Sequence, residues 1–185
     1  MPITAIDPRT ALIVVDLQVG TLGNPTVHPV ADIVTNSTAV LAAFRARGLP
    51  IVLANVTGTP AGRNDYGGGA RSFPDEWSSL IPELRASPED ILVTRDSWDA
   101  FVGTDLQERL DAEGVTQVVI VGVATSFGVE STARHAYDLG YNVVVVTDAV
   151  TDMRAEAHEN SVARIFPILG ETATAAEVQS LLTRD

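Results

Sequence analysis

Short, continuous apolar runs recur along the chain, and a polar or small residue ends each of them. Five of these runs are rich in β-branched residues: residues 11–16, 50–55, 90–94, 117–122 and 142–147. A run without alternation is typical of a strand covered on both faces, because both rows of side chains are then apolar. The pattern therefore predicts buried, parallel strands.

Helical patterns lie between and after these runs, over residues 29–47, 105–113, 128–139, 153–165 and 174–182. Gly48, Gly114 and Gly140 follow the first three patterns and are typical helix stops. The alternation of strand and helix implies right-handed crossovers. The expected fold is α/β: a three-layer sandwich with a central, mostly parallel sheet and helices on both faces.

The segment at residues 57–80 interrupts this alternation. It is rich in glycine and proline, including the run Gly67, Gly68 and Gly69, and is expected to be a long loop. Long loops inside compact domains are uncommon, and many of them are lids or binding elements. A lid and a surface decoration are both open interpretations.

The composition narrows the class of protein. A chain of 185 residues with 45% hydrophobic and 19% charged residues is expected to form a single domain over residues 1–185. Its net charge of −12 argues against nucleic acid as a partner, because phosphate binding requires clustered basic residues. The chain contains no cysteine, which excludes thiol catalysis, and all 12 basic side chains are arginine.

The apolar runs are too short for export or membrane insertion. Ala11 to Val15 is shorter than a signal-peptide core, and Val143 to Val146 falls far below the roughly 20 residues of a spanning helix. We expect a cytoplasmic protein with no membrane partner.

In parallel sheets, ligands bind beyond the carboxyl ends of the strands. In the expected fold, the carboxyl ends of four strands are followed by Asp16, Asn55, Arg95 and residues 122–128. Asp16 follows an apolar strand, where desolvation favours a raised pKa and a role as general acid or base. The alternative is an aspartate that caps the turn after the strand.

Residues 122–128 read GVATSFG and form an expected turn between strand and helix. Thr125 or Ser126 can cap the following helix, which by itself accounts for the hydroxyls. The backbone N–H groups at such a helix start can also bind a carboxylate or a developing oxyanion. No histidine lies in this segment to activate a hydroxyl nucleophile.

Three ordered segments carry a family resemblance: ALIVVDLQ from Ala11, VTRDSWDAFVGTDL from Val93, and VVIVGVATSFGVESTARHAYDLGYNVVVVTDAV from Val118. Together they resemble the isochorismatase-like superfamily, which includes nicotinamidases, carbamoylsarcosine amidases and isochorismatases. In that family the segments supply a catalytic Asp, a catalytic Lys and usually a Cys. The resemblance implies Asp16, Arg95 and Gly128 at these catalytic positions.

Two of the three positions depart from the amide-hydrolysing pattern. Gly128 stands where the cysteine would be. True isochorismatases also have glycine at this position, as the resemblance implies, and they cleave a vinyl ether without a covalent intermediate. There the aspartate protonates the enol carbon and water attacks the resulting oxocarbenium ion. Arg95 cannot lose its proton, but it can bind a substrate carboxylate, stabilise negative charge or fill space beside Gly128. The alternative is an Arg95 turned towards solvent in an inactive site.

The resemblance also implies a cis peptide within the turn from Val123 to Thr125, so that Ala124 and Thr125 bind substrate through their backbone. Arg63 resembles a position where a basic residue meets a carboxylate, with a surface arginine as the alternative. Three aromatic residues lie close in sequence to the catalytic positions: Trp98, Phe101 and Phe127. Each is a candidate for the wall of a ligand pocket, and ordinary packing in the core is the alternative for each.

A metal site and a nucleotide site are both disfavoured. His28, His135 and His158 are scattered along the chain, and the sequence contains no phosphate-binding glycine motif. We therefore expect no cofactor. The resemblance implies a homodimer or higher homo-oligomer.

Three functions remain open. The leading one is hydrolysis of a small, carboxylate-bearing molecule, such as an enol ether, by Asp16 without a covalent nucleophile. The second is water-mediated hydrolysis of an amide or ester with Asp16 as base. The third is a catalytically silent homologue that binds a small molecule.

Overall fold

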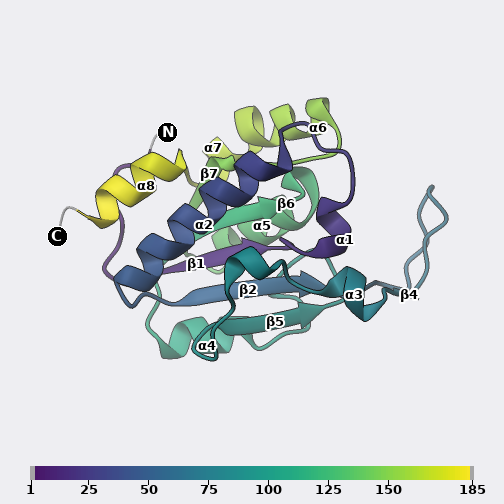
Figure 1. Ribbon diagram of the computed structural model, residues 1–185, viewed down its shortest axis with the longest axis horizontal. Coiled ribbons are helices and arrows are strands. Elements are labelled where there is room, and N and C mark those ends of the chain that lie inside the picture. The colour runs from purple at the N-terminus through teal and green to yellow at the C-terminus, as the bar shows by residue number, and fades with distance from the viewer. Residues whose placement is uncertain (1–2, 184–185) are drawn as a thin grey trace.

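The computed structural model describes residues 3–183. Six strands form one sheet in the order β5-β2-β1-β6-β7-β8, and each neighbouring pair is parallel (Figure 1). The strands are β1 (Thr10–Val15), β2 (Ile51–Val56), β5 (Ile91–Arg95), β6 (Gln117–Val123), β7 (Asn142–Thr151) and β8 (Glu171–Ala173). The five predicted strands are confirmed, and β8 adds an edge strand that the pattern did not predict.

The central strand β1 explains why an uninterrupted apolar run becomes a strand here. All six of its side chains are buried. Ala11, Ile13 and Val15 belong to one hydrophobic core, whereas Leu12 and Val14 belong to the core on the opposite face. Because successive strand side chains point to opposite faces, a strand between two cores is apolar on both faces, as β1 is from Ala11 to Val15.

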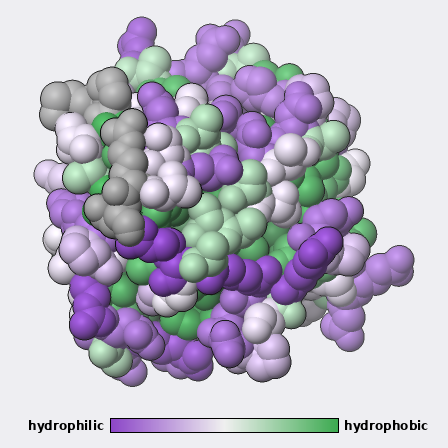
Figure 2. All heavy atoms as spheres, turned by 60° about the vertical axis from the view of Figure 1, so that its left-hand side comes forward, coloured by the Kyte–Doolittle hydropathy of each residue, from purple (hydrophilic) through white to green (hydrophobic). Residues whose placement is uncertain are grey.

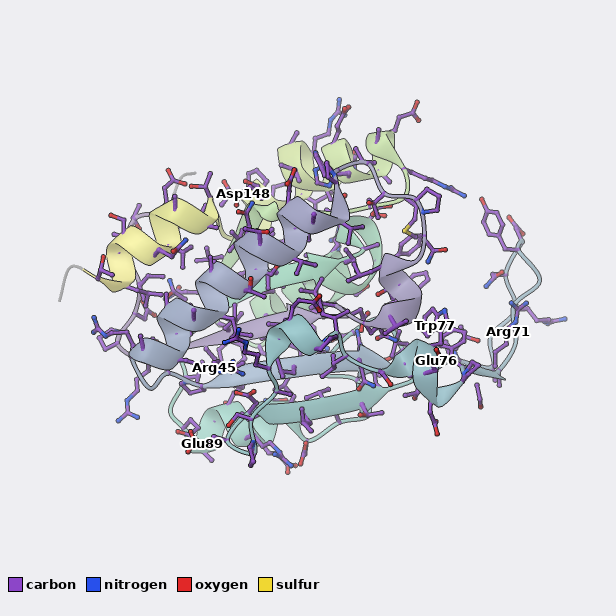
Figure 3. The ribbon with its side chains drawn as sticks, viewed as in Figure 1. Arg45, Arg71, Glu76, Trp77, Glu89 and Asp148 are labelled. Carbon is purple, nitrogen blue, oxygen red and sulfur yellow. The ribbon has the colours of Figure 1, made fainter. Side chains whose placement is uncertain are left out.

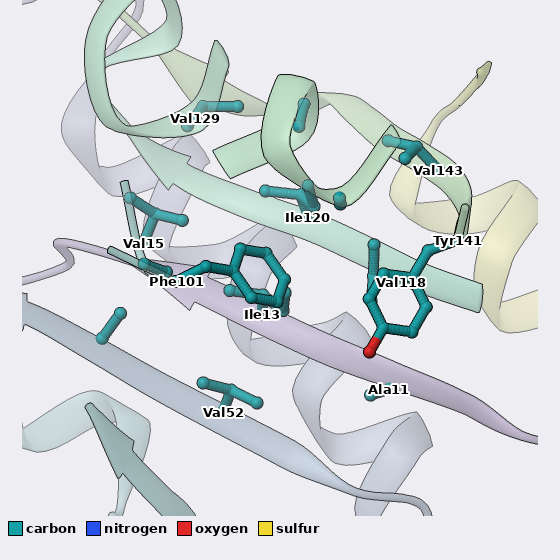
Figure 4. Packing of buried hydrophobic residues seen from close by; sticks show 14 of the residues in the cluster. Ala11, Ile13, Val15, Val52, Phe101, Val118, Ile120, Val129, Tyr141 and Val143 are labelled. Atoms are coloured by element: carbon teal, nitrogen blue, oxygen red, sulfur yellow. The ribbon is translucent and has the colours of Figure 1, made fainter. Parts of the chain in front are cut away.

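Helices cover both faces of the sheet and complete the predicted three-layer sandwich. On one face α2 (Val30–Ala46) packs along β7 and beside α8 (Ala175–Leu182). The opposite core receives side chains from α4 (Leu106–Ala112), α5 (Glu130–Asp138) and α7 (Phe166–Leu169). Figure 4 shows this second core, where aromatic rings lie over the aliphatic side chains of β1 and β6.

The remaining elements are short. They are α1 (Val19–Leu22), α3 (Asp75–Ser78), η1 (Pro82–Leu84), η2 (Thr125–Val129), α6 (Ala155–Asn160) and η3 (Ser161–Ile165). Both η2 and η3 are π-helical turns, and η2 leads directly from the turn after β6 into α5. The expected helix at residues 153–165 is therefore divided into α6 and η3.

β7 continues beyond its predicted end. Its pairing with β6 changes register, because Ile120 lies opposite Val145 whereas Gly122 lies opposite Val150. The extra residues in β7 form an irregularity of the β-bulge kind. After it, the strand rejoins β6 and places Asp152 beside the turn that follows β6.

The expected loop at residues 57–80 contains regular structure as well. β3 (Gly58–Thr59) pairs antiparallel with β4 (Arg71–Ser72), and residues 60–70 project from the body between them; we call these residues the arm (Figure 1). Inside the arm, the Asn64 side-chain oxygen accepts hydrogen bonds from the N–H groups of Tyr66 and Gly68 at 2.9 and 3.1 Å. These bonds give the arm a defined conformation.

The surface of the molecule carries mostly polar and charged side chains on the face seen in Figure 2. This face lies on the left in Figure 1, and its hydrophilic side chains are interspersed with smaller hydrophobic areas. Within residues 3–183, no helix is both long enough and apolar enough to cross a membrane.

Candidate functional site

Asp16 lies directly after β1 and is only 6% exposed. Its φ of 50° is in the left-handed region, which few residues other than glycine adopt and which often occurs at functional sites. Burial raises the pKa of the Asp16 carboxyl above its ordinary value, and the charge and hydrogen bonds of Arg95 offset part of that rise. The expectation of a desolvated aspartate at this strand end therefore agrees with the structure.

Arg95, at the end of β5, holds both oxygens of the Asp16 carboxylate. Its Nη1 donates to Oδ1 at 2.5 Å and its Nη2 donates to Oδ2 at 3.0 Å. The same Nη2 also donates to the Trp98 carbonyl oxygen at 2.9 Å. With a side chain only 1% exposed, Arg95 is not turned towards solvent, so the orientation expected in that alternative is wrong.

Within residues 3–183, the Nε of Arg95 has no hydrogen-bond partner. A buried guanidinium that leaves one N–H unsatisfied is costly unless its other contacts are strong. The two-point contact with Asp16 is such a contact, because parallel N–H to oxygen bonds match the fork of the guanidinium. The position of Arg95 is thus set by Asp16.

Gly128 completes the trio of catalytic positions that the resemblance implies. A Cβ atom built on Gly128 would lie 2.8 Å from Cγ1 of Val15, 3.1 Å from Oδ2 of Asp16 and 3.4 Å from the Trp98 carbonyl oxygen. The structure therefore brings Asp16, Arg95 and Gly128 together at the carboxyl ends of β1, β5 and β6. It also leaves almost no space at Gly128 for a side chain.

The turn between β6 and η2 contains a cis peptide bond between Val123 and Ala124, as the resemblance implied. The N–H and hydroxyl of Ser126 both donate to Oδ2 of Asp152, at 2.7 and 2.8 Å. The Phe127 N–H donates to the Ala124 carbonyl. These two N–H groups are engaged inside the protein, so they do not form the anion site that the turn suggested.

Sequence reasoning missed two residues that support this turn, Asp152 and His158. Asp152 is fully buried and also accepts a hydrogen bond from the Arg154 N–H. His158 shares a 2.9 Å hydrogen bond between its Nδ1 and the hydroxyl of buried Thr125. Burial lowers the pKa of His158, and the charge of His28 lowers it further. In the sequence, both residues are marked only by their position after the apolar run of β7. That position points to the site only because β7 extends to Thr151.

Gln18 is a third residue that the sequence did not single out. Its fully buried amide binds the backbone of Val56 in both directions, accepting from the N–H at 2.9 Å and donating to the carbonyl at 3.0 Å. A weaker bond reaches the Trp77 carbonyl at 3.3 Å. Gln18 therefore connects the segment after β1 with the end of β2 and with α3.

The other predicted site residues lie in different surroundings. Trp98 is 56% exposed, and its ring meets the ring of Phe127 edge-on with centroids 4.8 Å apart. Phe101 is buried in the core, between the rings of His135 and Tyr141. Trp98 and Phe127 thus border the site. Phe101 packs in the core, which was the alternative expected for it.

Asn55 and Ala124 have mainly internal contacts. The Asn55 amide donates to the Ser78 carbonyl at 2.9 Å and accepts from the Thr94 hydroxyl at 2.8 Å. Ala124 packs against the core on the α2 face. Asn55 therefore holds β2, β5 and α3 together at the edge of the site.

A cavity of about 600 Å³ lies outside the Asp16 site, between the arm and the segment after β5. Arg63, predicted as a binding residue, lines it together with Arg71, Tyr66 and Trp98. Figure 3 shows Arg71 where the arm leaves the body and Trp77 of α3 nearby. Asp16, Arg95 and Gly128 do not line this cavity, so the predicted site has two separate parts.

Across residues 3–183, the structure contains no group of three or more His, Cys, Asp or Glu side chains placed to hold a metal ion. The pair formed by Nδ1 of His135 and Oδ2 of Asp99, 2.5 Å apart, is the closest contact of such groups near the cavity. Asp99 also accepts from the Phe101 N–H. The Asp99 carboxylate is thus engaged inside the protein.

Comparison with known proteins agrees with this architecture. The isochorismatase domain family matches residues 10–177. The isochorismatase family protein YecD of Escherichia coli O157:H7 is 35% identical over 94% of this chain and 96% of its own length. The ureidoacrylate amidohydrolase RutB of Methylobacterium radiotolerans is 28% identical over 96% of this chain and 81% of its own length.

A solved structure extends the similarity to three dimensions. The isochorismatase family protein from Burkholderia thailandensis superposes with a TM-score of 0.90 at 41% identity, covering 96% of this chain and 97% of the other. The family match spans most of the chain and includes all three strand ends that carry Asp16, Arg95 and Gly128. The chain therefore belongs to the isochorismatase family.

Proposed function

We propose that this chain hydrolyses a small, carboxylate-bearing molecule, with Asp16 as general acid or base and without a covalent enzyme intermediate. One observation carries the proposal: the buried carboxyl of Asp16, paired with Arg95, lies 3.1 Å from the place that a Cβ atom on Gly128 would take. Relatives that are named as hydrolases, such as the ureidoacrylate amidohydrolase RutB, support hydrolysis as the reaction class.

The leading reaction is hydrolysis of an enol ether. Asp16 would transfer its proton to the enol carbon, and water would add to the resulting oxocarbenium ion and return a proton to Asp16. The hemiketal then breaks down to a ketone and an alcohol. This sequence requires a carboxyl that is protonated when substrate binds, and burial of Asp16 favours that form because it raises the pKa.

A second reaction is favoured by the two-point contact with Arg95. A guanidinium that binds both oxygens stabilises the ionised carboxylate, and an ionised Asp16 can act as base for water that attacks an amide or ester. The two reactions differ in their pH dependence. Activity falls as the pH rises through the controlling pKa for a general acid, and it rises for a general base.

The same contact also supports a non-catalytic alternative, because Arg95 already binds both oxygens of Asp16. A silent homologue would keep the pocket for binding and use the ion pair as a structural element. The measurement of turnover separates this alternative from both reactions.

The decisive experiment compares the unchanged protein with Asp16→Asn on isochorismate and on a panel of small amides and esters. We expect turnover that Asp16→Asn reduces by about a hundredfold or more, since general acid and base groups contribute at least that much. Asp105→Asn is the matched control, because Asp105 forms an exposed pair with Arg109 away from the site. Melting curves verify that each variant is folded at the assay temperature.

Full activity of Asp16→Asn would overturn the proposal. Absence of turnover on every compound tested would favour the silent homologue. A loss of activity in Asp105→Asn equal to that in Asp16→Asn would show that the assay reports stability and not chemistry.

A further inference from the structure

The segment after β5 contributes a backbone carbonyl to the Asp16 site. The Trp98 carbonyl oxygen accepts from Nη2 of Arg95 at 2.9 Å, and it lies 3.4 Å from the place that a Cβ atom on Gly128 would take. The same Nη2 donates to Oδ2 of Asp16. Because a guanidinium is planar and rigid, the position of one acceptor restricts the direction of its other N–H groups. The Trp98 carbonyl therefore helps to align Arg95 with Asp16.

Hydrogen bonds within the segment give it a defined shape. Trp98 is 56% exposed, so packing of its side chain does little to hold its carbonyl. The Ser97 hydroxyl donates to the Asp99 carbonyl at 3.2 Å, and the Phe101 N–H donates to Oδ1 of Asp99 at 2.8 Å. These bonds join residues of the segment to one another. Its place relative to the rest of the site therefore depends on contacts with other elements.

Two side chains of α5 hold this segment. The Ala100 N–H donates to the hydroxyl of fully buried Thr132 at 3.1 Å. About one helical turn further along α5, Nδ1 of His135 lies 2.5 Å from Oδ2 of Asp99. The His135 ring also packs against the ring of Phe101, with centroids 5.2 Å apart. Because residues three positions apart share one face of a helix, α5 holds the segment at two adjacent points.

The same helix is joined to the other side of the site. α5 follows η2 without a break, and η2 contains Gly128. His135 comes about two helical turns after Gly128. The contact between His135 and Asp99 therefore fixes the distance between the turn that contains Gly128 and the segment that contains the Trp98 carbonyl.

We propose that His135 and Asp99 are a positioning pair for the Asp16 site. Their contact holds the Trp98 carbonyl against Arg95 and thereby keeps the guanidinium aligned with Asp16. Both residues act through others, because in the described part of the chain neither forms a hydrogen bond with Asp16 or Arg95. The inference rests on the proposed function for its kinetic readout only, and a spectroscopic readout tests it without turnover.

The experiment compares His135→Asn with His135→Leu. The two new side chains have nearly the same shape, but only the amide carries an N–H that can replace Nδ1 as donor to Asp99. Fluorine NMR of protein labelled with fluorotryptophan reports the two tryptophans of the chain, Trp77 and Trp98, and Trp98→Phe assigns their signals. We expect the Trp98 signal to move in His135→Leu and to keep its position in His135→Asn. The Trp77 signal should stay unchanged in both variants.

Turnover is the second readout. In His135→Leu, kcat should fall by about tenfold or more while KM changes by less than about twofold, because a displacement of roughly 1 Å slows the reaction more than it weakens binding. His135→Asn should retain most of the kcat of the unchanged protein. Arg134→Gln is the control variant: Arg134 is half exposed on α5 and pairs with Glu130, so both readouts should stay unchanged.

Three results would overturn the inference: an unmoved Trp98 signal in His135→Leu, equal effects of His135→Asn and His135→Leu, or the same effects in Arg134→Gln. If the unchanged protein turns over none of the compounds, the proposed function fails, and the comparison of fluorine signals still decides this inference. The two proposals therefore fail separately.

Discussion

Gly128 packs so closely against Asp16 that a Cβ atom on it would lie 3.1 Å from the carboxylate Oδ2. The absence of a side chain at this position is therefore part of the packing around the ion pair of Asp16 and Arg95. This close packing determines what happens when a cysteine is placed at position 128.

Gly128→Cys alone is expected not to produce an efficient amidase. The new Cβ would lie 2.8 Å from Cγ1 of Val15, so Val15 or the turn must shift, and Arg95 already binds both oxygens of the carboxylate that would act as base. A displacement of about 1 Å can cost roughly a hundredfold in rate. Adding Arg95→Lys should give a higher kcat/KM on nicotinamide and other small amides than the two single changes combined. High activity of Gly128→Cys by itself would show that Arg95 performs the role of the lysine.

The ion pair of Asp16 and Arg95 is expected to show strong coupling in stability. Arg95→Met leaves a buried carboxylate without its partner and should lower the free energy of unfolding by about 3 kcal/mol. Asp16→Asn/Arg95→Met should cost less than the sum of the two single changes, because neither charge is then left alone. Chemical denaturation of all three variants measures the coupling. Arg109→Met is the control: it removes an exposed pair and should change the free energy of unfolding by about 0.5 kcal/mol or less. If the losses of stability from the single changes at Asp16 and Arg95 simply add in the double variant, the prediction is contradicted.

His158 gives the protein a specific pH dependence. Because burial lowers its folded-state pKa below the ordinary value of 6.5, the unfolded chain binds the proton more readily than the folded one. The stabilisation linked to neutral His158 is complete above pH 6.5 and is lost as the pH falls from there through the folded-state pKa. His28, Asp152 and Glu159 contribute charges around it.

The measurement is the free energy of unfolding of the unchanged protein and of His158→Gln, each followed from pH 8 to pH 5, a range of about one and a half pH units on either side of 6.5. The stability of the unchanged protein should fall more steeply below pH 6.5 than that of the variant. The difference between the two curves removes the titration of other groups. Parallel curves would show that His158 is not the responsible group.

Gly58 fixes the base of the arm. A Cβ atom on Gly58 would lie 2.3 Å from the Arg71 carbonyl oxygen, so Gly58→Ala should separate β3 from β4. The arm and β4 should then be exposed to trypsin, which cleaves after Arg63 in the arm and after Arg71 in β4. We expect cleavage of the arm to become several times faster. Gly48→Ala is the control: it has open space but a φ of 62°, so it should cost about 1 kcal/mol of global stability and leave the arm unchanged. Equal cleavage rates in both variants would contradict the assigned role of Gly58.

The sheet could be predicted because its strands lie between two cores. Thr10–Val15 and Gln117–Val123 are buried throughout, so their apolar runs carried the signal directly. β8 escaped prediction because its three residues, Glu171–Ala173, lie at the sheet edge and need no apolar pattern. The same applies to β3 and β4, whose two residues each are defined by pairing alone.

The site was predicted in part for a related reason. Asp16 and Arg95 end strands, and the rule that ligands gather at these ends brought them together before their contact was known. Asp152 and His158 depend on the length of β7 and on the packing of α6, which no local pattern encodes. Phe101 shows the reverse case, because its sequence neighbourhood suggested a pocket but its side chain points into the core.

The register shift in β7 makes the number of residues in that strand a constraint in its own right. Successive side chains of a strand alternate between faces, so deleting one residue between Val145 and Val150 would reverse the direction of every side chain that follows. Asp152 would then face away from Ser126 and release the turn after β6. Aligned relatives should accordingly vary in residue type across this stretch while keeping its length, and a redesigned sequence that omits the extra residues would dismantle the site without altering any of its members.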